Sequence, residues 1–397
     1  MKKSNVMTKL ECMVFVLLVF CFVQVFAAEC GDVNSNGVVN IIDALLIAQD
    51  YVDLNPENYD PSVADVNDDG KITIIDALLV AQFYVELIDE LNCGHQPVPN
   101  RLRVMMSSDI GGTDNDDQQS LVHFLVYSDL WDVEALISSP GGNGTVANIL
   151  DCLDSYEQDY SNLVSHSSDY PTPAYLRSVT KQGARDAAPS QGYTQPTEAS
   201  EWIAAVAMNG DPRPLWLTIW GGPEDLAQAL HDHPEIESKM RVYWIAGPNR
   251  KNFPNGAKYI ANNHKNLWII EADETYRGFF NGGDMSGDLS NSEFPRQHID
   301  GHGELGEYFM LHRESIKMGD TPAVTYTIDN EVRNPGDPTQ PGWGGAFIPQ
   351  GGDRPFCWVD DPSQSSEGYD GAATVNIHRE AYLRDFQARM DRCQSPR

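Results

Sequence analysis

The sequence carries the same twelve-residue acidic loop twice, at Asp32–Asp43 and at Asp65–Asp76. In each copy, positions one, three, five and twelve hold Asp or Asn, and position six is Gly. Calcium loops use oxygen ligands with this spacing, take one further ligand from the carbonyl of position seven, and need glycine at their sharp turn. The predicted ligands of two calcium ions are therefore Asp32, Asn34, Asn36, Val38 and Asp43, and Asp65, Asn67, Asp69, Lys71 and Asp76.

Each loop runs into a nearly identical helical segment, Ala44–Gln49 or Ala77–Gln82, and this repetition argues against chance. An EF-hand loop has Glu at position twelve and a helix on both sides, whereas each loop here has Asp at position twelve and a helix only after it. This pattern resembles a type I dockerin, a small all-α calcium-binding module, here residues 29–93. The resemblance implies a cohesin of a scaffoldin as partner, contacted through loop positions ten and eleven: Ile41, Ile42, Ile74 and Ile75. A calcium-bound spacer without a partner is the alternative, but isoleucine at all four places favours an interface.

The first residues have the pattern of a secretory signal. Met1-Lys2-Lys3 is basic, the stretch from Met13 to Phe26 is apolar but short for a membrane span, and Ala27-Ala28 are small. We expect residues 1–28 to be removed and the mature chain to be extracellular, either free or on the cell surface within a cellulosome-like complex. A retained anchor is the alternative; after cleavage no membrane association is expected.

The formal net charge of −31 limits the partners of the chain. A strongly acidic protein repels phosphate backbones, so nucleic-acid binding is disfavoured.

Cys30 and Cys93 stand at the two ends of the repeat module. No cysteine pair has zinc-ligand spacing, and export favours disulfides. We expect a Cys30–Cys93 bridge; two free thiols are the alternative.

Residues 94–100 contain two prolines and suit a linker, after which the large domain spans residues 101–397. Apolar runs predict strands at 102–107, 133–138, 214–220, 242–246 and 267–271. Helical patterns are predicted at 118–127, 223–231 and 257–263. Alternating strands and helices indicate an α/β domain with an open, mostly parallel sheet, whose ligand site lies at the carboxyl ends of the strands.

The first of these strands leads into a Gly-rich turn that holds Asp109, Asp114, Asp116 and Asp117. Carboxylates at this density repel one another unless a cation or a helix N-terminus offsets their charge. Such hard oxygen ligands suit calcium or magnesium. Helix capping by Asp116 or Asp117 is the simpler alternative, but it accounts for one carboxylate only.

This turn resembles the opening motif of the inosine-uridine nucleoside hydrolases. It is more similar to a nucleoside-hydrolase-like family of secreted proteins once described as cellulose-binding, whose further strings match Trp220–Gly222, Gly319–Pro322 and Gly342–Gly345. The resemblance covers about residues 101–355 and implies a sheet of nucleoside-hydrolase type. It also implies one calcium ion in the large domain, with the ligands Asp109, Asp116, Asp117 and Asp320.

The same resemblance implies roles in catalysis and substrate binding. Asp109 or Asp114 is expected to accept a proton from water, and the two can exchange the roles of base and ligand. His302 is the candidate proton donor, although a lone histidine in a Gly-rich loop is more often structural. The candidate substrate-binding residues are Trp220, Asn249, Glu274 and Arg277.

Together these features predict a secreted, scaffold-attached, calcium-dependent hydrolase. Its substrate is expected to be a glycosidic bond, including the N-ribosidic kind, in the degradation of plant cell-wall polysaccharides. A non-catalytic carbohydrate-binding protein on a cellulosome-like scaffold is one alternative, and a purely structural acidic site is another. What distinguishes them is whether a proton-accepting aspartate stays free of the metal.

Overall fold

The computed structural model describes residues 30–395 except 35, 53, 57, 68–70, 86, 89–90, 92–100, 113–114, 141–143 and 329–334. The chain divides into two compact units between residues 96 and 97. The expected signal (1–28) and linker (94–100) lie outside the described residues. None of the helices in the described ranges has the length and apolar character needed to cross a bilayer.

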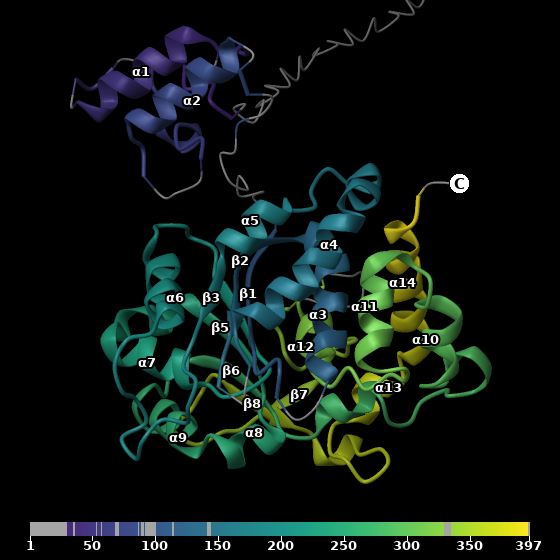
Figure 1. The fold of residues 1–397 in the computed structure, drawn as a ribbon. Coiled ribbons are helices and arrows are strands. Elements are labelled where there is room, and N and C mark those ends of the chain that lie inside the picture. The colour runs from purple at the N-terminus through teal and green to yellow at the C-terminus, as the bar shows by residue number, and fades with distance from the viewer. Residues whose placement is uncertain are drawn as a thin grey trace, which may run out of the picture. The chain divides into compact units, whose positions relative to one another are not determined.

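The described part of the small unit is all-α. Helix α1 (Ile41–Tyr51) follows the first acidic loop and α2 (Ile74–Tyr84) follows the second, as Figure 1 shows. The two helices pack against each other around a core to which both repeats contribute. The core residues are Val33, Ala44, Ile47, Val63, Ala64, Val66, Ala77 and Val80. The predicted all-α module is confirmed.

The last aspartate of each loop joins the loop to its helix. Asp43 Oδ2 accepts a hydrogen bond from the Asn40 backbone N–H (2.9 Å), and Asp76 Oδ2 accepts one from Thr73 (2.8 Å). Asp43 Oδ1 also accepts a bond from Asn34 Nδ2 (2.7 Å). Burial raises the pKa of Asp43, and the nearby Asp32 carboxylate adds to the rise. The first loop thus gathers buried carboxylates that need a cation; Asp69 of the second loop lies outside the described residues.

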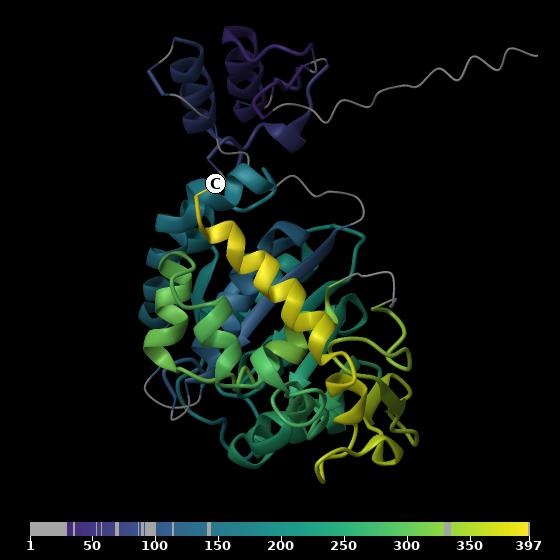
Figure 2. The ribbon, with the colours of Figure 1, turned by 90° about the vertical axis from the view of Figure 1, so that its right-hand side faces the viewer.

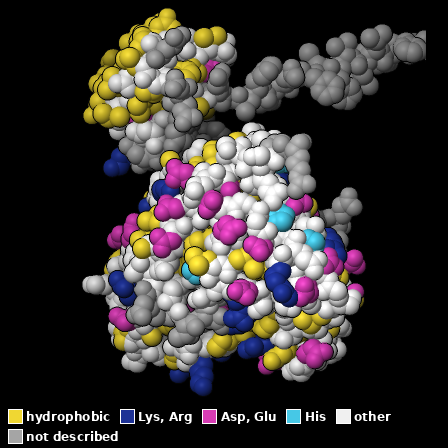
Figure 3. All heavy atoms as spheres, turned by 45° about the vertical axis from the view of Figure 1, so that its right-hand side comes forward, with side chains coloured by type: hydrophobic (Ala, Val, Ile, Leu, Met, Phe, Trp, Pro, Cys, Tyr) yellow, Lys and Arg dark blue, Asp and Glu magenta, His cyan; other side chains and the backbone are white. Residues whose placement is uncertain are grey.

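The isoleucines predicted to contact a partner lie on the surface. The exposed fraction is 48% for Ile41 and 51% for Ile42, and it is 47% and 49% for Ile74 and Ile75. Figure 3 shows apolar side chains gathered over much of this small unit. Equivalent positions are therefore equally available in the two repeats.

One of the two cysteines expected to form a disulfide is described by the structure. Cys30 is disulfide-bonded, whereas its expected partner Cys93 lies outside the described residues. Cys152, Cys357 and Cys393 are buried free thiols.

The large unit, within its described residues, contains one eight-stranded sheet in the order β3-β2-β1-β4-β5-β6-β8-β7. Neighbouring strands are parallel except for the last pair, β8 and β7. The predicted open, mostly parallel sheet is confirmed. The strands are β1 (Leu102–Ser108), β2 (Trp131–Ser138), β3 (Thr180–Gln182), β4 (Leu215–Ile219), β5 (Met240–Ile245), β6 (Trp268–Ala272), β7 (Phe347–Pro349) and β8 (Cys357–Asp360).

Helices cover both faces of this sheet, and its central strands β1, β2, β4, β5 and β6 are therefore almost entirely buried. One face packs against α6 (Glu198–Met208), α7 (Glu224–Asp232) and α9 (Pro254–Asn263). The other packs against α3 (Asp116–Val126), α4 (Val146–His166), α10 (Glu293–His298), α11 (Gly303–His312), α12 (Thr321–Tyr326) and α14 (Arg379–Met390). Figures 1 and 2 show these two helical layers, with α14 lying beside α10 and α11.

Every strand and helix predicted for the large domain is present, with ends shifted by a few residues. The elements without a prediction include β3, β7, β8, helix α6 of the first layer and most helices of the second layer. The three strands are only three or four residues long, so their periodicity is too short to be recognised.

We predict that the small unit requires calcium to fold, because Asp32, Asp43 and Asp76 are buried and neighbouring carboxylates repel one another without a cation. Far-UV circular dichroism of the isolated segment 30–93 should show helix in calcium and lose it in excess chelator. Restored calcium should restore the helix. Helicity that persists in chelator would contradict the prediction.

Candidate functional site

The candidate site lies where the order of the strands reverses. The chain runs from β1 to β2 and β3 on one side, then returns to β4 and continues to β5 and β6 on the other. The ends of β1 and β4 are aligned, since Ser107 pairs with Ile219 and the Trp220 N–H donates to Ser107 O (2.7 Å). A crevice forms at the carboxyl ends of such strands because the following segments diverge. Here it is a cavity of about 540 Å³.

Three carboxylates meet in this cavity: Asp116, Asp117 and Asp320, hereafter the carboxylate cluster. Asp116 and Asp117 are the first residues of α3, and Asp320 immediately precedes α12. One oxygen from each lies within 4.8 Å of the other two. Calcium binds oxygens at about 2.3–2.6 Å, so ligands across the ion stand up to about 5 Å apart. The cluster therefore fits a hard divalent cation.

Two glycines allow the chain to approach these side chains. A Cβ on Gly319 would lie 2.5 Å from Asp116 Oδ2, and a Cβ on Gly221 would lie 2.7 Å from the Cβ of Asp109. Neither distance is sterically tolerable for a side chain. The Gly-containing strings at 220–222 and 319–322 are thus required by the packing of the acidic residues.

The electrostatics of the cluster also favour a cation. Burial raises the pKa of Asp116 to about 7, and repulsion from Asp117 adds to the rise. Burial and the neighbouring carboxylates hold the pKa of Asp117 and of Asp320 well above the ordinary value. Lys317 Nζ lies 3.5 Å from Asp116 Oδ2 and offsets part of the negative charge. A divalent ion would offset the remainder and let all three groups ionise.

Asp109 lines the same cavity but does not belong to the carboxylate cluster. It stands in the turn after β1, and its carboxyl contacts that of Asp117. Burial raises the pKa of Asp109 to about 7. Asp117 is held from its other side by Ser108 Oγ, which donates to Asp117 Oδ1 (2.5 Å). The site thus combines a cation-binding group with a separate carboxyl able to accept a proton near neutral pH.

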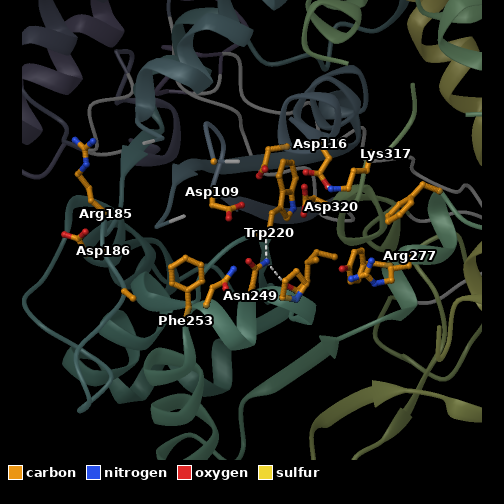
Figure 4. Close-up of a pocket in the computed structure, with 18 residues that line it drawn as sticks. Asp109, Asp116, Arg185, Asp186, Trp220, Asn249, Phe253, Arg277, Lys317 and Asp320 are labelled. Atoms are coloured by element: carbon orange, nitrogen blue, oxygen red, sulfur yellow. Dashed lines mark hydrogen bonds and ion pairs between the residues drawn. The ribbon is translucent and has the colours of Figure 1, made fainter. Parts of the chain in front are cut away.

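Asn249 and Trp220 form another wall of the cavity. Asn249 Nδ2 donates to Trp220 O and to Ile245 O, both at 2.9 Å, as the dashed lines in Figure 4 mark. These bonds fix the amide, so its oxygen is available to a ligand as an acceptor. Trp220 is almost fully buried, and its indole Nε1 has no acceptor among the described residues.

Of the other residues predicted for catalysis or substrate binding, only some line this cavity. Arg277 lines the cavity, with its guanidinium over the rings of Tyr276 and Tyr369. Glu274 and His302 do not line it. The Glu274 carboxylate accepts from the Asp370 N–H (2.9 Å), and His302 Nε2 lies 3.1 Å from Asp391 Oδ1. Asp114 lies outside the described residues.

The residues that line the cavity but were missed by sequence reasoning include Arg185, Asp186, Phe253 and Lys317. In Figure 4, Arg185 and Asp186 lie toward one end of the cavity and Arg277 toward the other. Arg185 and Asp186 follow β3, so the rule that places sites after strands would have found them had this short strand been recognised. Phe253 carried no such signal, because it ends a short helix, α8 (Gly247–Asn252).

Buried acids at the start of α7 hold the loop that carries Arg185 and Asp186. The Ala184 N–H donates to Asp225 Oδ1 (2.9 Å), and the Ala188 N–H donates to Glu224 Oε1 (3.3 Å). Burial raises the pKa of Glu224 to about 8, and the adjacent Asp225 contributes. Glu224 Oε2 has no partner among the described residues. The position of the loop thus depends on a carboxyl that is costly to ionise.

Two family models match the chain. The model described as "Cellulose-binding Sde182, nucleoside hydrolase-like domain" matches residues 103–347, more than half of the sequence. The chain belongs to this family. The second model, the type I dockerin domain, matches residues 30–83. Both resemblances inferred from the sequence are confirmed, and the Sde182-like domain is thus joined to a dockerin, a type of domain that binds calcium and pairs with cohesins.

Solved structures resemble the Sde182-like domain. One is a nucleoside hydrolase-related hypothetical protein from Saccharophagus degradans, described as associated with carbohydrate metabolism. It is 29% identical in sequence, and its TM-score is 0.62. The match covers 75% of this chain and 73% of that chain. A purine-preferring ribonucleoside hydrolase from Gardnerella vaginalis is 13% identical, with coverage of 73% and 98% and a TM-score of 0.42. A comparison with curated proteins found no match.

We predict that Glu224→Gln stabilises the Sde182-like domain at alkaline pH. The folded-state pKa of Glu224 is raised from 4.5 to about 8, so its contribution to stability is complete below pH 4.5 and is lost as pH rises through 8. Between these values the wild type should lose up to about 1.4 kcal/mol of unfolding free energy per pH unit relative to the variant. Urea unfolding in constant calcium, followed by fluorescence of the tryptophans, all of which lie in this domain, measures the difference. An equal pH dependence of the two proteins would contradict the prediction.

Proposed function

We propose that the protein is a secreted, scaffold-attached hydrolase of glycosidic bonds that depends on calcium in its large domain. The observation that carries the proposal is the arrangement of four acids in one cavity at the strand-order reversal. Three form the carboxylate cluster, and the fourth, Asp109, stands beside them as a separate carboxyl. A metal site with an adjacent free base is what metal-assisted hydrolysis requires.

A calcium ion held by Asp116, Asp117 and Asp320 would polarise a water molecule and orient two sugar hydroxyls. Asp109 accepts the proton of that water as its oxygen forms a bond to the anomeric carbon. The bond from this carbon to the leaving oxygen or nitrogen breaks, and the leaving group takes a proton from solvent. Neighbouring carboxylates stabilise the positive charge that develops on the sugar ring. Of the two bases expected from the sequence, Asp109 is the one for which the described residues give a position.

The wall that Asn249 and Trp220 form orients the substrate. Asn249 offers a fixed amide oxygen as an acceptor, which suits the donating hydroxyls of a sugar. Arg185, Asp186 and Phe253 at one end, with Arg277 at the other, provide contacts beyond the reacting sugar. Sites on both sides of the cluster favour a glycan over a single nucleoside. We infer that the substrate is a plant cell-wall polysaccharide.

The dockerin domain supports the extracellular part of the proposal. A dockerin places its chain on a cohesin-bearing scaffold, and scaffolds of this kind work outside the cell on insoluble glycans. The expected signal at residues 1–28, the disulfide at Cys30 and the strongly acidic surface agree with export.

A non-catalytic carbohydrate-binding protein is the second candidate. The description of the family as cellulose-binding favours it. In that case the cation would position sugar hydroxyls without activating water, and Asp109 would have no proton to accept.

We predict that Asp117→Ala loses metal and activity together, whereas Asp109→Asn keeps the metal and lowers turnover by roughly two to four orders of magnitude. The first change removes a ligand, and the second removes only the proton acceptor. Asp284→Asn, which changes an exposed acid, is the matched control and should behave as wild type.

Bound calcium should be measured in the large domain expressed without the dockerin, together with release of reducing sugar or free base from nucleosides and cell-wall oligosaccharides. A metal-loaded protein that binds glycans and hydrolyses none of them would favour the second candidate. Full turnover by Asp109→Asn would remove Asp109 from the mechanism.

We also predict that the two isoleucine pairs of the dockerin are alternative cohesin contacts, because near-identical repeats place them at equally exposed positions. Replacing Ile41 and Ile42 by Asp should leave binding largely intact, as should replacing Ile74 and Ile75. Replacing all four should abolish it. Surface plasmon resonance on a panel of type I cohesins provides the test, and loss of binding after one double replacement would contradict it.

A further inference from the structure

A second cavity, of about 440 Å³, lies at the opposite edge of the sheet from the carboxylate cluster. Its residues stand at or just before the first residues of β5, β6 and β8, which run parallel. The amino-terminal ends of parallel strands lie together, away from the carboxyl ends that form the candidate active site. This second cavity is therefore separate from the hydrolytic machinery.

Its apolar surface is aromatic. Phe356, which precedes β8, is 46% exposed although it is a large hydrophobic residue. Trp268, at the start of β6, is nearly buried and packs against Trp216 and Trp358. Phe356 is thus an open ring on the cavity wall, and Trp268 is a rigid part of its lining.

The polar groups of the cavity are both donors and acceptors. The Arg241 guanidinium lies over the Trp268 ring, 5.5 Å from its centroid, and it donates a hydrogen bond to the carbonyl of the preceding residue, Met240. Desolvation lowers the pKa of Arg241, and no carboxylate among the described residues pairs with it, although acidic residues outnumber Lys and Arg by 58 to 27. Asn266 lines the cavity and is exposed. Glu235 and Glu237 supply carboxylates: Glu237 Oε1 accepts from the Asn266 N–H (2.7 Å), and Glu235 Oε1 lies 3.3 Å from His233 Nδ1, so each carboxylate keeps further acceptor capacity.

This combination selects one ligand chemistry. A phosphate or a carboxylated ligand would be repelled by Glu235 and Glu237, and a cation by Arg241. A purely apolar ligand would leave the guanidinium desolvated without a partner. A pyranose ring has an apolar C–H face that stacks on an aromatic ring and hydroxyls that both donate and accept, so it suits an exposed ring, a guanidinium and carboxylates together.

We propose that this cavity is a second glycan-binding site, which holds a neutral pyranose unit of a β-linked polysaccharide through Phe356, Arg241 and Asn266. The sugar face rests on Phe356, and its hydroxyls accept hydrogen bonds from Arg241 and donate to Glu235 or Glu237. The site performs no chemistry. It binds polymer at the edge of the domain remote from the carboxylate cluster, and it does not depend on hydrolysis there.

Affinity electrophoresis of the full secreted chain tests this proposal, with gels that contain mixed-linkage β-glucan, xyloglucan or xylan. At least one of these glycans should retard the wild type. Phe356→Ala and, separately, Arg241→Gln should weaken that binding by about tenfold or more, because each removes a principal contact. Leu311→Ala, which removes an even more exposed apolar side chain elsewhere, should leave it unchanged. Thermal unfolding of each variant verifies the fold, and Phe356 is exposed enough to be replaced without loss of core packing.

Asp117→Ala separates this site from the active site. Retardation that is lost in Phe356→Ala but kept in Asp117→Ala supports a second site, whether or not the protein hydrolyses any glycan. Retardation that is lost only in Asp117→Ala would place all glycan binding at the carboxylate cluster and overturn the proposal. Unaltered mobility of the wild type in all three glycans would overturn it as well.

Discussion

The large domain depends on the burial of several carboxylates at the reversal of strand order. Asp117 and Asp320 are almost fully buried, and among the described residues the nearest cation to the cluster is Lys317, which contacts Asp116. Burying unpaired charge is among the most expensive events in folding. Gly221, Gly319 and the Ser108 hydroxyl make close packing of these acids feasible, and the divalent cation that we propose would make it stable. Much of the local structure follows from that requirement.

The small unit solves the same problem differently. Its loops place aspartates at fixed spacing, and the last one of each loop also caps the following helix, as Asp43 and Asp76 do. The predicted ligands are local in sequence, so each repeat carries a ligand set of its own. In the large domain, Asp116 and Asp320 come from segments that only the folded sheet brings together. The chain thus carries local ligand sets in the dockerin, and in the large domain a long-range carboxylate cluster that we propose as a cation site.

The two proposed glycan sites differ in a way that suits different tasks. The cavity at the carboxyl ends of the strands is acidic and holds a candidate base, Asp109. The cavity at the amino-terminal ends has an exposed ring, Phe356, and a guanidinium without a carboxylate partner among the described residues. A hydrolytic reaction requires charged groups that point toward the reacting atoms, whereas binding of a polymer requires ring stacking and hydrogen bonds. Separation across the sheet lets each surface serve one purpose.

The sequence by itself determined the features that are periodic or contiguous: the duplicated calcium loops, the α/β alternation and the acidic turn from Asp109 to Asp117. Local spacing is enough to specify these, because their ligands and strands are near in the chain. Only the tertiary structure decided that Asp109 stands beside the cluster, that Glu274 and His302 lie outside the cavity, and that Arg185, Phe253 and Lys317 line it. These positions depend on strand order and on loops packed by distant residues, which no local pattern encodes.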